Sequence, residues 1–389
     1  MIHGLALLVF FRPFVCSLVL PGRNLFYAAT FFGFLVVWMG LRKTFSPEKN
    51  ITAAAAIFMG ILAVLSLLSD SHLIAAATLS QYVTGILLFL ICRTLPYDHA
   101  NKIFNIIIAA GITISLMGLY QFLFGFQNTL DFMRSVKIDD LFVTQEIQQK
   151  RVYSVFITSN TLGNYLVMLL PLSLTLRNKL WAIPLALALL LTQSVGSFMT
   201  LLMIFPFYAY QRRLFNPAVF ELFAALILIG VGFIFWRTQT HMTNFNLAHS
   251  FDMRWQYWKE TWALITSHPL IGTGFGNFDI PSSRYSHNII LQLWAETGLA
   301  GLLAFLYLLL TIFQQGWSSL TEAPDLDRST ALLFSATIFL LNNLIDFSFF
   351  LPEVALVWCV ILGLACNRSA PTDDSPMPAE NSSVPTRTA

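Results

Sequence analysis

Long, nearly uninterrupted runs of apolar residues follow one another through most of this 389-residue chain. Charged residues make up only 11% of the sequence, whereas a soluble domain carries about 25%. Apolar residues supply 56%, and the mean hydropathy is +0.68. These values exclude a disordered chain and a nucleic-acid-binding protein with a basic face. They predict a polytopic α-helical membrane protein that contacts membrane lipids.

A helix needs about 20 mostly apolar residues to cross a membrane. The sequence predicts about twelve such spans in an all-α transmembrane bundle. In chain order they cover residues 4–20, 25–41, 51–69, 73–92, 103–126, 155–176, 180–194, 196–211, 217–236, 287–313, 330–350 and 352–367. The seventh and eighth are short and could form one broken hairpin. Arg12 interrupts the first, where it could snorkel or serve as the counter-ion of a carboxylate such as Asp346.

Basic residues gather in alternate connections between these spans, which favours the cytoplasmic side for those connections. They are Arg42, Lys43, Lys49, Arg93, Lys102, Arg177, Lys179, Arg212 and Arg213. Both termini are then cytoplasmic, and two longer loops, 127–154 and 237–286, lie outside. Residues 1–367 form one transmembrane domain, and residues 368–389, rich in Pro, Ser, Thr and Ala, predict a disordered cytoplasmic tail.

The large outer loop contains aromatic residues at helical spacing. Trp255, Trp258, Trp262 and Ile265 predict a short amphipathic helix that lies on the membrane surface. Arg254 stands at its start. The alternative is an aromatic belt with solvated charges.

A Gly-rich segment follows that helix. Gly272, Gly274 and Gly276 occupy alternate positions, which permits close approach of the backbone to a ligand. Their N–H groups could form an anion-binding nest, or the segment could be a plain tight loop. The spacing is not that of a dinucleotide site.

The next segment predicts a helix with a polar stripe. Ser286 is a suitable N-cap, and Asn288, Gln292 and Glu296 follow four residues apart. Glu296 would then lie inside the membrane, where an ionisable group suggests function. His287, at the outer mouth, can accept a proton near pH 7 or be only an interfacial residue. With an ordinary pKa of ~6.5, it would lose that ability below about pH 6.

Further polar residues are expected at the same outer end. Arg151 and Asn160 flank the start of the sixth span, Arg284 lies in the large loop, and Asp346 lies near the end of the eleventh span. The spacing of His, Cys and carboxylate residues matches no metal-binding motif.

With these residues in view, the stretch from Arg254 to Gly301 resembles the signature region of the O-antigen ligase and O-antigen polymerase family. The matching elements are Arg254 with Trp258, the run Pro269–Phe278, His287-Asn288, Glu296-x-Gly298 and Gly301. Residues 151–156 and 159–165 resemble an upstream segment of the same family. The resemblance covers about a third of the chain. Val195 departs from it, because members often carry Arg there, and so does Ser159, where Pro usually precedes the Asn.

The resemblance implies a twelve-span enzyme at the outer, periplasmic face of the bacterial cytoplasmic membrane. It would transfer a glycan from an undecaprenyl-diphosphate carrier, with inversion and without a metal or nucleotide cofactor. For that chemistry His287 is the expected catalytic base, and Arg254 and Arg151 would hold the diphosphate. The expected substrate-binding residues are Arg284, Asn160, Asn288, Glu296, Gly274 and Gly276.

Several functions stay open at this point. A ligase passes the glycan to a lipid A core sugar, whereas a polymerase passes it to another lipid-linked chain; compact size favours the ligase. A lipid-linked glycan transporter would place its polar groups midway along several spans instead of at one end. A scaffold for envelope assembly would tolerate replacement of His287 and Arg254.

Overall fold

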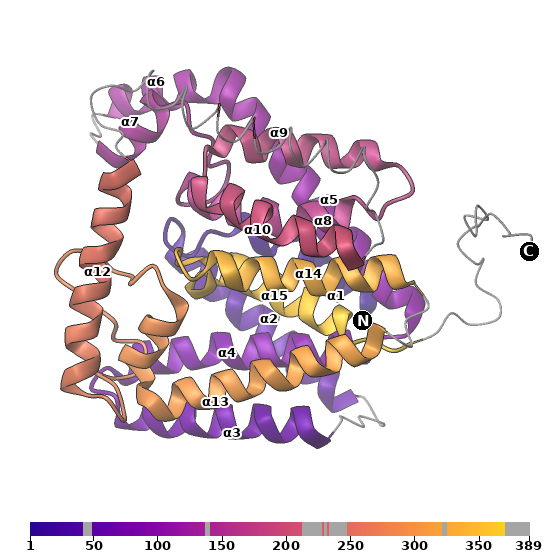
Figure 1. Ribbon diagram of the computed structural model, residues 1–389, viewed down its shortest axis with the longest axis vertical. Helices are drawn as coiled ribbons and strands as arrows, with labels where there is room; N and C mark the ends of the chain where they lie inside the picture. The colour runs from indigo at the N-terminus through magenta and orange to yellow at the C-terminus, as the bar shows by residue number, and fades with distance from the viewer. Residues whose placement is uncertain are drawn as a thin grey trace, which may run out of the picture.

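The computed structural model describes residues 1–41, 49–136, 141–211, 247–320 and 325–369, with the single positions 228 and 232. Helices are the only extended regular elements in these ranges, so the all-α prediction is confirmed. Most of them run side by side in one bundle, with α3, α4, α13 and α14 nearly parallel to a common axis (Figure 1).

The chain forms α1 (Ile2–Phe11), α2 (Pro21–Leu41), α3 (Lys49–Leu68), α4 (His72–Arg93), α5 (Tyr97–Tyr120), α6 (Phe126–Val136), α7 (Leu141–Gln148), α8 (Ser159–Ser173), α9 (Ala182–Thr192), α10 (Val195–Gln211), α12 (Leu247–Ser267), α13 (Ile289–Ser319), α14 (Leu326–Asn342) and α15 (Pro352–Ala365). Among the described residues, 5 helices are long and apolar enough to cross a membrane, and shorter apolar helices accompany them. The expected number of twelve spans therefore stays a prediction. The proposed span 217–236 lies outside the described residues, except at positions 228 and 232.

The first predicted span, 4–20, is not one helix. α1 ends at Phe11, and a short 3-10 turn continues through Pro13, which removes a backbone donor from the helix. Arg12 is only 2% exposed and forms an ion pair with Glu353, at 3.6 Å between Nη2 and Oε2. The expectation that Arg12 serves as a counter-ion is confirmed, and its partner is Glu353.

The last helix, α15, lies inside the bundle. It packs against α4, α14 and α13, and residues on all its faces are buried, as expected of a helix that is apolar all round. This central helix fixes the position of the segment before it, residues 343–351. The sequence had predicted a span over 330–350, but α14 ends at Asn342.

Asn343 explains this early end. Its side chain donates to the Phe339 carbonyl at 2.8 Å and accepts from the Phe349 N–H at 2.7 Å. An Asn side chain that bonds to nearby backbone in this way competes with the helix and favours its end.

α13 changes direction at Gly298, whose backbone is non-helical with φ 66° and ψ −175°. The left-handed φ suits glycine, and a Cβ at this position would collide with the Leu270 carbonyl. The Gly-rich loop thus packs into the break in α13. The Leu299 N–H completes this contact by donating to the Pro269 carbonyl at 2.9 Å.

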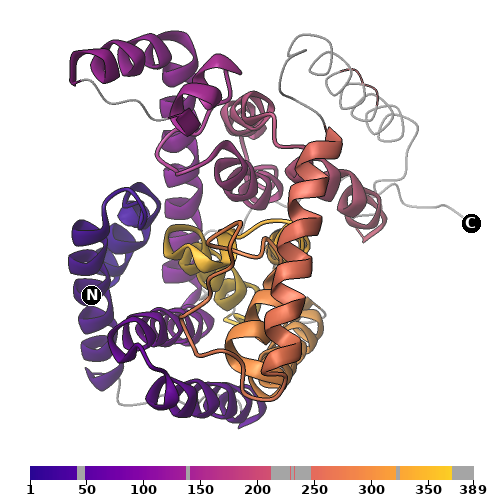
Figure 2. The same ribbon diagram turned by 90° about the vertical axis from the view of Figure 1, so that its left-hand side faces the viewer.

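One end of the bundle carries α12, which crosses the ends of the other helices instead of running beside them (Figures 1 and 2). α13 begins at this end and α14 ends there, because the Ile289 N–H bonds to the Asn343 carbonyl at 2.9 Å. Arg93 is the last residue of α4, Lys102 lies near the start of α5, and Lys179 begins the short 3-10 turn before α9. The orientation inferred from the charge pattern stays a prediction.

Candidate active site

The predicted amphipathic helix is confirmed as α12, which is longer than expected. Ile265 is 2% exposed and faces the bundle, whereas Trp255 and Trp262 are about half exposed. The Trp262 ring meets the ring of Trp294 on α13 edge to face, with 5.7 Å between centroids. α12 is thus held against α13 by one face, and its contact with a membrane surface stays a prediction.

Arg254 on α12 is anchored to the segment between α14 and α15. Its Nε donates to the Ile345 carbonyl at 2.9 Å, and its Nη1 donates to the Ser250 carbonyl at 3.0 Å. Burial lowers the pKa of Arg254, and the nearby charge of Asp346 acts in the opposite direction. The guanidinium is therefore held in one orientation.

His287 lies beside Arg254 in an aromatic cage. The ring stacks on Tyr257 with 5.3 Å between centroids and meets Phe347 edge to face at 4.7 Å. Its Nδ1 is buried and forms no hydrogen bond, so Nε2 is the ring nitrogen available to a substrate. Its backbone has a left-handed φ of 55°, which is uncommon for a residue other than glycine.

The environment of His287 changes its acid–base behaviour. Burial, and secondly the positive charge of Arg254, lower its pKa to about 3. The ordinary pKa of ~6.5 expected from the sequence therefore does not hold for this enclosed ring, and a decline of activity below about pH 6 is no longer expected for the free enzyme. A histidine in the open at a membrane interface would have behaved as expected; this one is enclosed.

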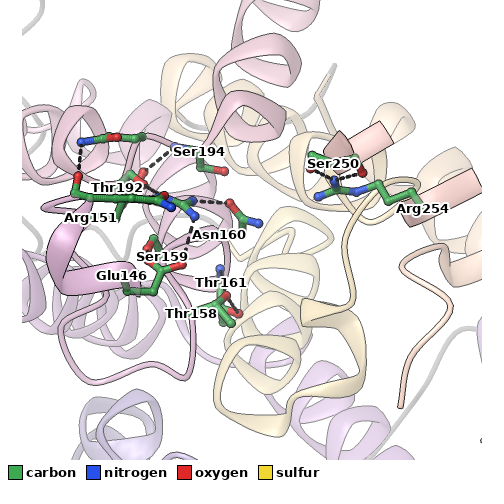
Figure 3. A network of polar contacts seen from close by, with 12 residues as sticks. Glu146, Arg151, Thr158, Ser159, Asn160, Thr161, Thr192, Ser194, Ser250 and Arg254 are labelled. Atoms are coloured by element: carbon green, nitrogen blue, oxygen red, sulfur yellow. Dashed lines mark hydrogen bonds and ion pairs between the residues drawn. The ribbon is translucent and has the colours of Figure 1, made fainter. Parts of the chain in front are cut away.

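Arg151 approaches from the other side of the site, from the loop between α7 and α8. Nε donates to the Thr192 carbonyl at 3.1 Å, and Nη2 donates to Asn160 Oδ1 at 2.8 Å (Figure 3). Nη1 forms an ion pair with Glu146 Oε1 at 3.0 Å. Asn160 is thus a direct partner of Arg151 and holds its guanidinium.

The charge of Arg254 acts on Arg151. Burial lowers the pKa of Arg151, Glu146 raises it, and the charge of Arg254 lowers it further. Figure 3 shows the guanidinium of Arg254 pointing toward the side on which Arg151 and Asn160 lie. Two cations that repel each other across a site can be stabilised by an anion between them.

The residue that caps the start of α13 is not the predicted Ser286. Asn288, not Ser286, is the N-cap: its Oδ1 accepts from the N–H groups of Ile290 and Leu291 at 2.9 and 3.0 Å. Ser286 Oγ instead accepts from the Asn288 N–H at 3.1 Å. Asn288 also donates through Nδ2 to the Leu344 carbonyl at 3.0 Å. Its side chain is occupied by these contacts.

Glu296 binds the Gly-rich loop. Its carboxylate accepts from the Gly276 N–H at 3.0 Å and from Gln292 Nε2 at 2.9 Å. The Gly276 N–H, proposed as part of an anion-binding nest, is thus already bound to the carboxyl group of Glu296. Gly274 stands two residues earlier in this loop, with a φ of 119°.

A cavity of about 330 Å³ lies inside the bundle next to this loop. Its wall is mostly apolar and comes largely from α4, α13 and α15. Gly276, Gln292, Glu296 and Arg284 also line it, and Arg284 is exposed. Most of the expected site residues therefore form two groups: Arg151, Asn160, Arg254 and His287 in one, and Arg284, Glu296 and Gly276, which line this cavity, in the other.

The comparison with known families bears on this arrangement. Residues 180–306 match the family model described as O-antigen ligase. This part of the chain is therefore similar to the O-antigen ligase family. No curated protein matches the chain. The O-antigen ligase match includes α12, the Gly-rich loop, His287 and the first half of α13, whereas Arg151 and residues 343–347 lie outside it.

Sequence reasoning missed three parts of this site. Tyr257 and Phe347, which enclose His287, are two aromatic residues in a chain with 11 Tyr and 36 Phe, so composition does not single them out. The carbonyl of Ile345 binds Arg254, but every residue has a carbonyl.

Within the described residues no group of three or more His, Cys, Asp or Glu could hold a metal ion.

Proposed function

We propose that the protein is a membrane glycosyltransferase that transfers a glycan from an undecaprenyl-diphosphate carrier to a hydroxyl of a lipid A core sugar. The family match supports a glycan-transfer role in lipopolysaccharide synthesis. The observation that carries the finer proposal is the position of Arg254, whose charge lowers the pKa of both His287 and Arg151 and so relates the imidazole to both guanidinium groups.

These three residues suit an inverting displacement. Nε2 of His287 takes the proton of the acceptor hydroxyl as its oxygen forms a bond to the anomeric carbon. The bond from that carbon to the diphosphate oxygen breaks, and the diphosphate leaves with the electron pair. Arg254 and Arg151 stabilise the charge of this leaving group through hydrogen bonds to phosphate oxygens.

The low pKa of His287 gives donor binding a second consequence. A base with a pKa of about 3 is weak at pH 7. A diphosphate bound to Arg254 offsets the positive charge that contributes to this low value. Binding of the donor therefore raises the pKa of His287 and strengthens the base when it is needed.

Arg151 also bears on the departure from the family pattern at Val195. Its Nε donates to the carbonyl of Thr192, at the end of α9 and three positions before Val195 in the chain. Val195 has no charge and cannot contact phosphate as an arginine at that position would. We therefore assign this contact to Arg151.

The proposal also places the protein in the membrane. Residues 1–367 form the transmembrane enzyme, residues 368–389 form a cytoplasmic tail, and the site faces the periplasm. We assign the end that carries α12 to the outside, because Arg93 and Lys102 belong to the end of α4 and the start of α5 on the other side of the bundle. The substrate contacts proposed for Arg284, Asn160, Asn288, Glu296, Gly274 and Gly276 belong to this same assignment.

The decisive experiment is transfer by the folded His287→Ala variant, assayed with purified lipid-linked glycan and rough lipopolysaccharide as acceptor. We expect a loss of about 10²–10⁴-fold, the usual effect of removing a general base. His268→Ala is the matched control, because His268 is exposed in the same part of the chain. Near-normal turnover by the His287 variant would reject the mechanism, and lengthening of the lipid-linked chain without acceptor would identify a polymerase.

A further inference from the structure

The segment between α14 and α15 contacts the candidate site through consecutive residues. The carbonyls of Asn343, Leu344 and Ile345 accept hydrogen bonds from the Ile289 N–H, Asn288 Nδ2 and Arg254 Nε. Two residues later, the Phe347 ring contacts His287. The start of α13, Arg254 and His287 are therefore all held by one short segment.

This segment is itself fixed. Asp346 accepts from the Phe347 N–H and from Ser348 Oγ, both at 2.8 Å, and Asn343 accepts from the Phe349 N–H at 2.7 Å. Phe347 and Phe349 are 7% and 8% exposed. A segment with so many internal bonds is able to hold a neighbouring ring in one place.

Phe347 stands between two rings. On one side Tyr285, which lines the apolar cavity, stacks on it with 4.7 Å between centroids and 15° between planes. On the other side it meets His287 at 69°. With Tyr257 stacked on the imidazole, only part of the His287 ring is open to a substrate.

We propose that Phe347 is a positioning residue for transfer: it holds the imidazole of His287 with Nε2 toward the acceptor and keeps water from the rest of the ring. The proposal rests on the function proposed for His287. Phe347 contacts no reacting atom and acts only through His287.

Replacement of Phe347 should change the pKa of His287 if the ring encloses the imidazole, and should leave that pKa unchanged if the ring only fills space. The titratable groups around His287 are Arg254 and Tyr257 on α12, and Asp346 and Tyr285 on the loops. None of them changes when Phe347 is replaced. Water that enters in place of the ring would hydrate the imidazolium, which removes part of the burial that lowers its pKa.

The test compares Phe347→Leu with Phe349→Leu. The latter is a matched control, because Phe349 is equally buried but contacts Tyr82, Phe305 and Trp358 instead of His287. kcat/KM for the lipid-linked donor is measured between pH 5 and pH 8, since it reports ionisations of the free enzyme. For wild type we expect no decline at the acid end of this range.

For Phe347→Leu we expect kcat at pH 7 to fall by about 10- to 100-fold and an acid-side decline to appear inside the range. Phe349→Leu should lower thermal stability without moving the pH profile. A flat profile for Phe347→Leu, with a loss no larger than that of the control, would overturn the proposal.

A second measurement is independent of activity. NMR titration of isotope-labelled histidine in purified wild type and Phe347→Leu, assigned with His287→Ala, gives the pKa of His287 directly. We expect a higher value in the variant, and Phe347→Met replaces Phe347→Leu if the latter does not fold. An unchanged pKa would reject the enclosing role of Phe347, whereas full activity of His287→Ala would reject the proposed function instead.

Discussion

The carboxylate of Glu296 accepts a hydrogen bond from the main-chain N–H of Gly276, with 3.0 Å between the two atoms. One residue lies on α13 and the other on the Gly-rich loop, so this bond joins the two elements that flank the cavity. Because Glu296 is 5% exposed, the bond is shielded from water. Glu296 therefore holds the loop in addition to any contact with a substrate.

Glu296→Ala should destabilise the protein. Leaving a buried donor without a partner costs about 1–3 kcal/mol, and the Gly276 N–H would lose its acceptor. Glu296→Gln keeps an oxygen at the same place and should have a smaller effect. Thermal unfolding of the purified protein in detergent measures both. Asp252→Ala, at an exposed position on α12, is the control; an equal melting temperature for all variants would contradict this role.

The Arg12–Glu353 ion pair predicts an asymmetry between single and double replacements. Arg12→Leu leaves Glu353 buried without a cation, and Glu353→Leu leaves Arg12 buried without an anion. Each should cost about 3–5 kcal/mol, whereas removing both charges should cost much less. A double-mutant cycle of unfolding midpoints, measured in the same detergent, gives the coupling. If the two single effects simply add, the pair does not act as a unit.

Arg254→Lys should lower transfer activity although it keeps the charge. Lysine cannot donate to the Ile345 carbonyl and at the same time offer a planar pair of N–H groups to a phosphate. We expect a fall in kcat/KM for the donor of at least about tenfold, equal to about 1.4 kcal/mol of transition-state stabilisation. Lys259→Arg, on the same helix but exposed, should behave as wild type. Wild-type activity of the Arg254 variant would make Arg254 a structural anchor only.

The proposed orientation can be tested with two exposed positions at opposite ends of the bundle, Asp252 and Lys179. A membrane-impermeant thiol reagent should label Asp252→Cys in intact spheroplasts and Lys179→Cys only after lysis. Three of the four native cysteines are buried, and labelling of the unmodified protein gives the background. The reverse pattern would place the site in the cytoplasm and reject the assignment of function.

The sequence predicts those parts of the molecule that depend on local pattern. Apolar runs predict the helices, Trp spacing predicts α12, and a charge inside the first apolar run marks Arg12 as either a snorkelling residue or a counter-ion. The location of His287 just before a long helix also follows from the pattern. In each case the residues concerned lie within a few positions of one another or differ sharply from their apolar surroundings.

The remainder depends on contacts between distant segments. Residues 343–347 read as the end of an apolar span, because Asn343 ends α14 through bonds that the sequence does not reveal. The rings that contact His287 belong to Tyr257 and Phe347, which are 30 and 60 positions away in the chain. Similarly, both Ser286 and Asn288 can cap a helix, and only the contact with Leu344 distinguishes them.

The break in α13 at Gly298 has a mechanical consequence. A long spanning helix tilts when the bilayer becomes thinner, at a cost of a fraction of a kcal/mol per Å of mismatch. Because the backbone at Gly298 is not helical, the longer part of α13 can tilt without rotating the first part. That first part, which carries Asn288 and Glu296, is tied to the Gly-rich loop and to Leu344. The geometry of the site is therefore isolated from changes in membrane thickness, so that activity should vary little with the acyl-chain length of the surrounding lipids.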